Sequence, residues 1–183
     1  MRDDLSERRI HTLNPALANQ IAAGEVIERP ASVVKELLEN SIDAGATELI
    51  IRVEQGGSTL IEIIDNGRGV HPEDLALAVM RHATSKIQTA DDLQAIMSLG
   101  FRGEALASIA AVSRLTLTSS QNNDGIGYQV EVNGTAFDHQ DIQAVATRQG
   151  THIRVQDLFF NVPARRKFLK KQGTEFGHIE EIV

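Results

Sequence analysis

One segment of this sequence is more informative about its class than any other: Glu36-Leu37-Leu38-Glu39-Asn40-Ser41-Ile42-Asp43-Ala44-Gly45-Ala46. An α-helix turns about 100° per residue, so Glu36, Asn40 and Asp43 fall on one side of it. The apolar stripe of the same helix consists of Val33, Val34, Leu37, Leu38 and Ile42. A carboxylate and a carboxamide one turn apart offer a general base and a hard oxygen ligand, which a metal–nucleotide site needs. Taken alone, however, such a pattern more often marks an exposed polar helix face.

The bulk composition limits the class of protein. A length of 183 residues suits one domain, and 42% hydrophobic with 23% charged residues is typical of a soluble globular protein. The chain has no run of eighteen apolar residues, and its charged start lacks the apolar core of a secretion signal. The absence of cysteine excludes disulfides and thiolate metal sites. A net charge of -7 argues against strong nucleic-acid binding by this segment alone, and we expect a cytoplasmic protein.

Capping and turn signals place the expected elements along the chain. Helices are expected to begin near Asn14-Pro15, Pro30, His71-Pro72, Thr89, Glu104 and Pro163. The first should end near Gly24 and the second at Gly45. Strands are expected over 48–54, 59–64, 114–119, 128–132 and 151–155, the first two forming a hairpin through 55–58. Helices come early and most strands late, which favours an α+β fold with helices on one face of a mixed, mostly antiparallel sheet.

The sequence Asp65-Asn66-Gly67-Arg68-Gly69 follows the second expected strand. Such sequences are common in turns, but here a helix follows rather than a partner strand. The glycines would let a ligand approach the backbone closely. A carboxylate at this strand end could accept a hydrogen bond from the exocyclic amine of adenine. Guanine would place two acceptors face to face, at a cost of roughly 1–3 kcal/mol. The motif therefore indicates either an ordinary turn or an adenine site read by Asp65.

A glycine-spaced loop, Gly100-Phe101-Arg102-Gly103, runs into the helix expected at Glu104. Free N–H groups at a helix start attract anions, so this loop could hold a phosphate or could simply join two helices. The chain contains neither a Walker A loop nor a dinucleotide fingerprint, so any nucleotide would be bound by a different architecture. Thr84 and Ser85 could also reach a phosphate, and Thr151 could bond a base edge, although each is a weak signal alone.

Four motifs stand in one order: E-x-x-x-N on a helix, D-x-G-x-G after a strand, a glycine-spaced loop before a helix, and G-T before a strand. Together they resemble the GHKL ATPase superfamily, which contains DNA gyrase B, heat-shock chaperone ATPases, sensor histidine kinases and the MutL mismatch-repair ATPases. Residues 19–30, 100–106 and 161–166 are similar to the signatures of the MutL branch. The resemblance implies a two-layer α/β sandwich of the GHKL (Bergerat) type over residues 10–183, with residues 1–9 forming a charged tail.

The resemblance also implies a role for each site residue. Glu36 would be the general base that activates water against the γ-phosphate, and Asn40 would hold Mg²⁺. Asp65 would read the adenine amine, and Asp43 would have a supporting structural role. The rest of the base pocket would comprise Gly67, Gly69 and Thr151. The lid over the phosphates would include Thr84, Ser85, Gly100, Phe101, Arg102 and Gly103.

The function implied by the resemblance is ATP binding and slow ATP hydrolysis in DNA mismatch repair, as a conformational switch between mismatch recognition and downstream repair factors. The implied partners of the full-length protein are a MutS-type mismatch recognition protein, a MutH-type endonuclease or a helicase, DNA, and a second copy in an ATP-dependent N-terminal homodimer. We expect no membrane association and a bacterial, nucleoid-associated location in the cytoplasm.

The resemblance also bears on turnover. The family's second domain, with a lysine that reaches the γ-phosphate, and its C-terminal domain are expected to lie outside this chain. Mg-ATP binding with little or no turnover is therefore the expectation for these residues. Two alternatives stay open. One is another GHKL ATPase, either a gyrase-like topoisomerase domain or a histidine kinase, and the other is a nucleotide-binding scaffold without turnover.

Overall fold

The computed structural model describes residues 12–80, 104–134 and 141–183. Over these residues six strands form one sheet in the order β1-β2-β6-β3-β4-β5. The strands are β1 (Leu49–Glu54), β2 (Leu60–Asp65), β3 (Arg114–Ser120), β4 (Ile126–Asn133), β5 (Gln143–Ala146) and β6 (Gly150–Gln156). The helices are α1 (Pro15–Val26), α2 (Pro30–Asp43), α3 (Leu75–Ala78), α4 (Ala105–Ala111), α5 (Pro163–Phe168) and α6 (Gln172–Glu180), with 3₁₀ turns η2 (Gln55–Gly57) and η3 (Pro72–Asp74).

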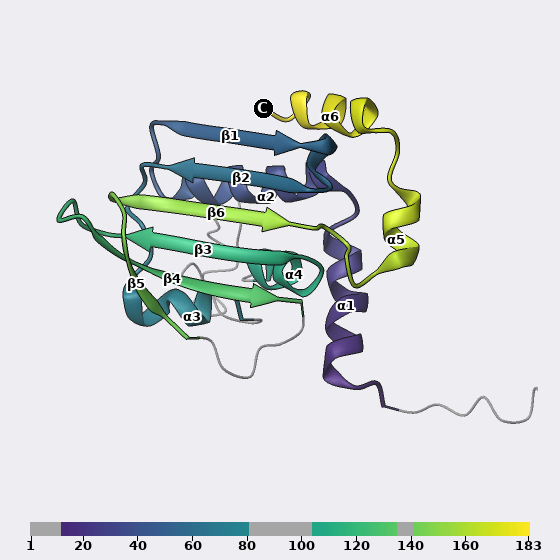
Figure 1. Cartoon of the computed structure of the whole chain (residues 1–183), viewed down its shortest axis with the longest axis horizontal. Helices are drawn as coiled ribbons and strands as arrows, with labels where there is room; N and C mark the ends of the chain where they lie inside the picture. The colour runs from purple at the N-terminus through teal and green to yellow at the C-terminus, as the bar shows by residue number, and fades with distance from the viewer. Residues whose placement is uncertain (1–11, 81–103, 135–140) are drawn as a thin grey trace, which may run out of the picture.

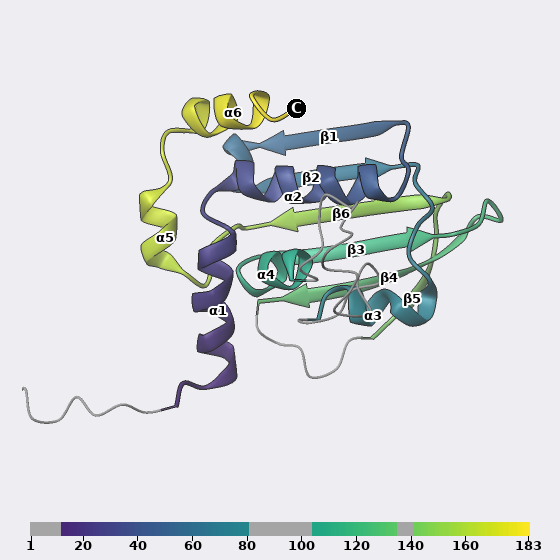
Figure 2. The same cartoon turned by 180° about the vertical axis from the view of Figure 1, so that it is seen from behind.

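The molecule has two layers. Figures 1 and 2 show α2, α3 and α4 against one face of the sheet, while none of the described helices covers its opposite face. The predicted α+β fold and the predicted β1–β2 hairpin are confirmed. Every pairing between the described strands is antiparallel, so the parallel pairs of a mixed sheet are not found among them. In the described parts of the chain, no helix is long and apolar enough to cross a bilayer.

The core lies between the sheet and these helices, and alternate strand residues point into it because side chains in a strand alternate between faces. Its members from the central strands are Ile61, Ile63, Leu115, Leu117, Ile153 and Val155. Helix α2 contributes Val33, Val34 and Leu37. The prediction that Ile42 extends this stripe is wrong, because Ile42 is 55% exposed. Ser41, four residues after Leu37, takes the inward position of the last turn and is 3% exposed.

The sequence predicts that the first helix ends near Gly24, but α1 continues to Val26. Gly24 lies within the helix, in close contact with the side chain of Arg165. A Cβ atom there would lie 2.6 Å from Nη2 of Arg165, so a larger residue would require the guanidinium to shift. Nη1 of Arg165 donates to the carbonyl oxygen of Ile27, at 3.2 Å, just beyond the helix. A cation at a helix C-terminus also interacts favourably with the helix dipole.

Two elements near the end of the chain differ from prediction. The single basic helix expected after Pro163 is divided into α5 and α6. At the break, Oε1 of the buried Glu175 accepts from the backbone N–H of Lys170 at 2.7 Å, just before α6 begins. Strand β5 was not predicted, because it is a short and largely exposed edge strand. The helix expected near Thr89 lies outside the described residues.

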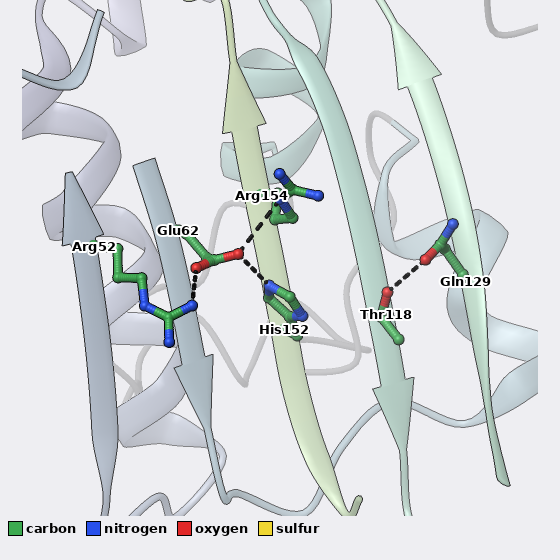
Figure 3. A network of polar contacts seen from close by, with 6 residues as sticks. All are labelled: Arg52, Glu62, Thr118, Gln129, His152 and Arg154. Carbon is green, nitrogen blue, oxygen red and sulfur yellow. Dashed lines mark hydrogen bonds and ion pairs between the residues drawn. The ribbon is translucent and has the colours of Figure 1, made fainter. Parts of the chain in front are cut away.

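The face of the sheet away from the helices is organised around Glu62 (Figure 3). Its Oε2 accepts from Nη1 of Arg52 at 2.8 Å, and its Oε1 lies 2.9 Å from Nε2 of His152 and 3.4 Å from Nε of Arg154. Burial by itself raises the pKa of Glu62, but the hydrogen bonds from His152 and Arg52 outweigh it. The net result is a Glu62 pKa below its ordinary value of 4.5.

Glu62→Gln is expected to lower the free energy of unfolding at pH 7 by about 1–2 kcal/mol, because it weakens charge-assisted hydrogen bonds. The lowered pKa of the folded state means that this contribution is present above the ordinary pKa of 4.5 and is lost as the pH falls through the folded-state value. Urea unfolding of parent and variant from pH 7 to pH 3 measures the difference, which should shrink with acidity.

A matched control is Glu131→Gln, because Glu131 lies on the same sheet, is exposed and, among the described residues, accepts from Gln129 alone, at 3.1 Å. This change should alter the unfolding free energy by less than about 0.5 kcal/mol. A destabilisation by Glu62→Gln that stayed constant across the pH range would contradict the role assigned to its charge.

Candidate functional site

Asp65 lies at the end of β2, directly opposite Thr151 at the start of β6. The backbone N–H groups of Gly67 and Thr151 donate to Oδ1 of Asp65 at 2.9 Å and 3.1 Å. The hydroxyl of Ser41, from the last turn of α2, donates to Oδ2 at 2.8 Å. Asp65 itself is 8% exposed. Three donors from three segments of the chain therefore hold this buried carboxylate in one orientation.

The glycines around Asp65 allow the chain to pack closely on itself. Gly69 has a φ of +71°, and a Cβ there would overlap the carbonyl oxygen of Ser120. A Cβ on Gly67 would lie 2.9 Å from Cβ of Ala44 and 3.1 Å from Oδ1 of Asp65. Larger residues at either position would displace the loop from Asp65 or from the neighbouring strand. Both glycines predicted for the site therefore determine the shape of its surroundings.

Thr151 is also connected through its side chain. Its Oγ1 lies 3.1 Å from Oγ of Ser119, a buried residue near the end of β3. Ser119 donates to the carbonyl oxygen of Gly150 at 2.8 Å and accepts from the backbone N–H of Val70 at 2.9 Å. Ser119 therefore connects β3, β6 and the loop that follows Asp65 (residues 66–70, the Asp65 loop) by hydrogen bonds.

Sequence reasoning missed both Ser41 and Ser119. Ser41 could have been found, because it stands four residues after Leu37 and therefore shares the inward face of α2. Ser119 has no such signal. Its role depends on the pairing of β3 with β6, which places it opposite Thr151.

The predicted catalytic face of α2 consists of Glu36, Asn40 and Asp43, and all three are partly buried. This helix packs along β2 (Figure 2), and Ser41 on the same turn as Asn40 touches Asp65. The fold therefore brings α2 beside the Asp65 loop. Six other predicted residues lie outside the described part of the chain: Thr84, Ser85, Gly100, Phe101, Arg102 and Gly103.

The chemistry of the available donors bears on a metal ion. In residues 12–80, 104–134 and 141–183, no group of three or more His, Cys, Asp or Glu side chains is placed to hold a metal. The amide oxygen of Asn40 is a hard ligand of the kind that Mg²⁺ accepts. Mg²⁺ usually takes one or two protein oxygens and completes its shell with phosphate oxygens and water. This donor set therefore fits a Mg²⁺ ion that arrives with a nucleotide.

Known proteins resemble the chain in sequence. The family model described as histidine kinase-, DNA gyrase B- and HSP90-like ATPase matches residues 27–159. The DNA mismatch repair protein MutL of Pseudomonas entomophila is 58% identical over 175 residues, covering 96% of this chain and 28% of the relative. MutL of Mannheimia succiniciproducens is 60% identical over 174 residues, covering 95% and 27%. The chain thus spans little more than a quarter of the length of these curated relatives.

Solved structures agree with the sequence comparison. The Aquifex aeolicus MutL ATPase domain complexed with ADP superposes with a TM-score of 0.65 and 37% identity, over 86% of this chain and 54% of that one. The N terminal domain of a DNA repair protein gives a TM-score of 0.74 and 30% identity, over 90% and 46%. The residues matched by the family model include α2, the Asp65 loop and Thr151. The chain therefore belongs to the histidine kinase-, DNA gyrase B- and HSP90-like ATPase family, and within it resembles the MutL mismatch-repair proteins.

Proposed function

We propose that this domain binds Mg-ATP between α2 and the Asp65 end of the sheet and hydrolyses it slowly. The observation that carries the proposal is the buried Asp65 carboxylate, held by three donors beside the helix that bears Glu36 and Asn40. The similar ATPase domain from Aquifex aeolicus was solved in complex with ADP, which supports the same ligand class.

Base recognition is assigned to the sheet end of the site. Asp65 accepts a hydrogen bond from the exocyclic amine of adenine, and guanine is disfavoured because its carbonyl would oppose the carboxylate. Thr151 donates to this carboxylate through its backbone N–H, and its hydroxyl lies 3.1 Å from Oγ of Ser119. Gly67 and Gly69 allow the Asp65 loop to pack closely against Asp65, Ala44 and Ser120.

Phosphate chemistry is assigned to α2. Asn40 holds Mg²⁺, and the bound ion offsets the charge of the phosphates. Glu36, one turn before Asn40, orients the attacking water and accepts its proton. Asp43 supports the end of the same helix. A lid over the phosphates is assigned to Thr84, Ser85 and the loop from Gly100 through Phe101 and Arg102 to Gly103.

In the longer protein, we assign this domain to DNA mismatch repair, because the curated relatives are named as MutL. Residues 10–183 form the ATP-binding domain in this proposal, and residues 1–9 form a tail. ATP binding and hydrolysis act as a switch that controls a homodimer, DNA binding and contacts with a MutS-type protein, a MutH-type endonuclease or a helicase. The site of action is the bacterial cytoplasm, at the nucleoid.

Asn40→Ala tests the phosphate end of this proposal. Calorimetric titration of the parent with ATP should give tighter binding when Mg²⁺ is present than when a chelator has removed it. The variant should lose most of that gain, by about tenfold in dissociation constant, because one metal ligand is gone. Asn133→Ala, at an exposed asparagine at the end of β4, is the control and should bind as the parent does. Equal Mg²⁺ dependence in parent and Asn40→Ala would contradict the assignment.

A further inference from the structure

We infer that Ser41 is the positioning residue for adenine recognition. Its hydroxyl orients Oδ2 of Asp65 so that this oxygen receives the exocyclic amine of the base. The inference rests on the proposed function and deepens it, because it names the oxygen that reads the base and the side chain that sets the position of that oxygen.

The acceptor positions of Asp65 are mostly occupied within the protein. An ionised carboxylate offers about four lone-pair positions, two on each oxygen. Oδ1 already accepts from the backbone N–H groups of Gly67 and Thr151. Oδ2 accepts from the Ser41 hydroxyl alone among the described residues. The acceptor position left for a ligand therefore belongs to Oδ2, the same oxygen that Ser41 holds.

The donors to Asp65 differ in kind. Gly67 and Thr151 donate from the backbone, so among the described residues Ser41 is the one side chain that orients this carboxylate. Ser41 is 3% exposed, and the 2.8 Å bond satisfies a hydroxyl that would otherwise be buried without a partner. Because the hydroxyl donates, Oδ2 keeps its acceptor character toward the ligand. An acceptor at this point distinguishes an amine from a carbonyl.

Ser41 also has a particular place on α2. It directly follows Asn40, so one turn of helix carries both the proposed metal ligand and the residue that orients the base-reading oxygen. Asp65 lies 24 residues further along the chain. The Ser41–Asp65 bond thus ties the phosphate end of the site to its base end.

A positioning role and a purely structural role predict different results. Loss of a structural hydroxyl would weaken the binding of every purine nucleotide alike. Loss of a positioning hydroxyl would weaken only those nucleotides whose amine reaches Asp65. Purine riboside triphosphate, which has hydrogen in place of the exocyclic amine of ATP, separates the two.

The experiment titrates the 183-residue chain and its variants with ATP and with purine riboside triphosphate, in Mg²⁺. Ser41→Ala should weaken ATP binding about tenfold, the equivalent of one hydrogen bond to a charged group. It should change the affinity for purine riboside triphosphate less than about twofold. Ser41→Thr, which keeps the hydroxyl, should restore most of the preference for ATP.

Ser113→Ala is the matched control. Ser113 is fully buried and donates to the carbonyl oxygen of Ile109 at 2.7 Å, so the same group is removed from an unrelated part of the core. Its preference for ATP over purine riboside triphosphate should equal that of the parent. If Ser41→Ala does not fold, Ser41→Cys carries the comparison, because a thiol fills a similar space but is a weak donor.

Two different failures are distinguishable. A parent that binds both nucleotides equally would refute adenine recognition by Asp65, and the role of Ser41 with it. A parent that prefers ATP, with that preference undiminished in Ser41→Ala, would overturn the role of Ser41 alone. Equal weakening of both nucleotides by Ser41→Ala would likewise overturn it.

Discussion

Glu36→Gln is expected to reduce ATP hydrolysis by about 10²–10⁴-fold while leaving ATP binding nearly unchanged. The carboxamide keeps the size and polarity of the side chain but cannot accept a proton from the attacking water. Single-turnover phosphate release, measured in a longer MutL-type protein that contains this domain, gives the rate. Calorimetric titration of the same protein with ATP gives the affinity.

The control for this change is Glu39→Gln, on the same helix. Oε1 of Glu39 lies 3.9 Å from Nζ of Lys35, and an ion pair of this kind at the surface contributes little. Hydrolysis and binding should both match the parent. Undiminished hydrolysis in Glu36→Gln would exclude Glu36 as the base. If hydrolysis and ATP affinity instead fell together, Glu36 would contribute to nucleotide binding rather than to the chemical step.

Asp65→Asn is expected to weaken ATP binding by about 100-fold, or roughly 2–3 kcal/mol. The amide NH₂ must replace one carboxylate oxygen. In place of Oδ1 it would meet the N–H groups of Gly67 and Thr151, and in place of Oδ2 it would meet the amine of adenine. The second orientation also offers guanine a donor, so the preference for ATP over GTP should narrow. Competition titrations with the two nucleotides measure both effects.

Asp157→Asn is the matched control, because the side chain of Asp157 is 49% exposed and its Oδ2 lies 3.2 Å from Nε of Arg114. ATP affinity should not change in this variant. Thermal unfolding of Asp65→Asn checks that the domain remains folded, since either orientation of the amide changes the hydrogen bonding that holds this side chain. A folded Asp65→Asn that binds ATP as well as the parent does would show that Asp65 does not read adenine.

Much of the architecture was predictable because its signals are local. Pro30 and Gly45 bracket α2, and the glycine-rich turn between β1 and β2 specifies a hairpin. The errors arose where a residue serves a distant neighbour. Gly24 reads as a helix end, but it lies within α1 in close contact with Arg165, and Ile42 reads as core although Ser41 faces inward.

The candidate site likewise has features that local sequence indicates and features that only the folded structure shows. The sequence alone was enough to propose Glu36, Asn40 and Asp65 as site residues, because a helix period and a strand end are set by neighbouring residues. It could not reveal what holds Asp65, since Ser41 and Thr151 lie 24 and 86 residues away along the chain. Those contacts depend on the pairing of β2 with β6 and on the packing of α2 along β2. The sequence thus suggests the groups of the proposed site from local motifs, whereas the contacts that hold Asp65 in one orientation depend on how the strands pair and how α2 packs on the sheet.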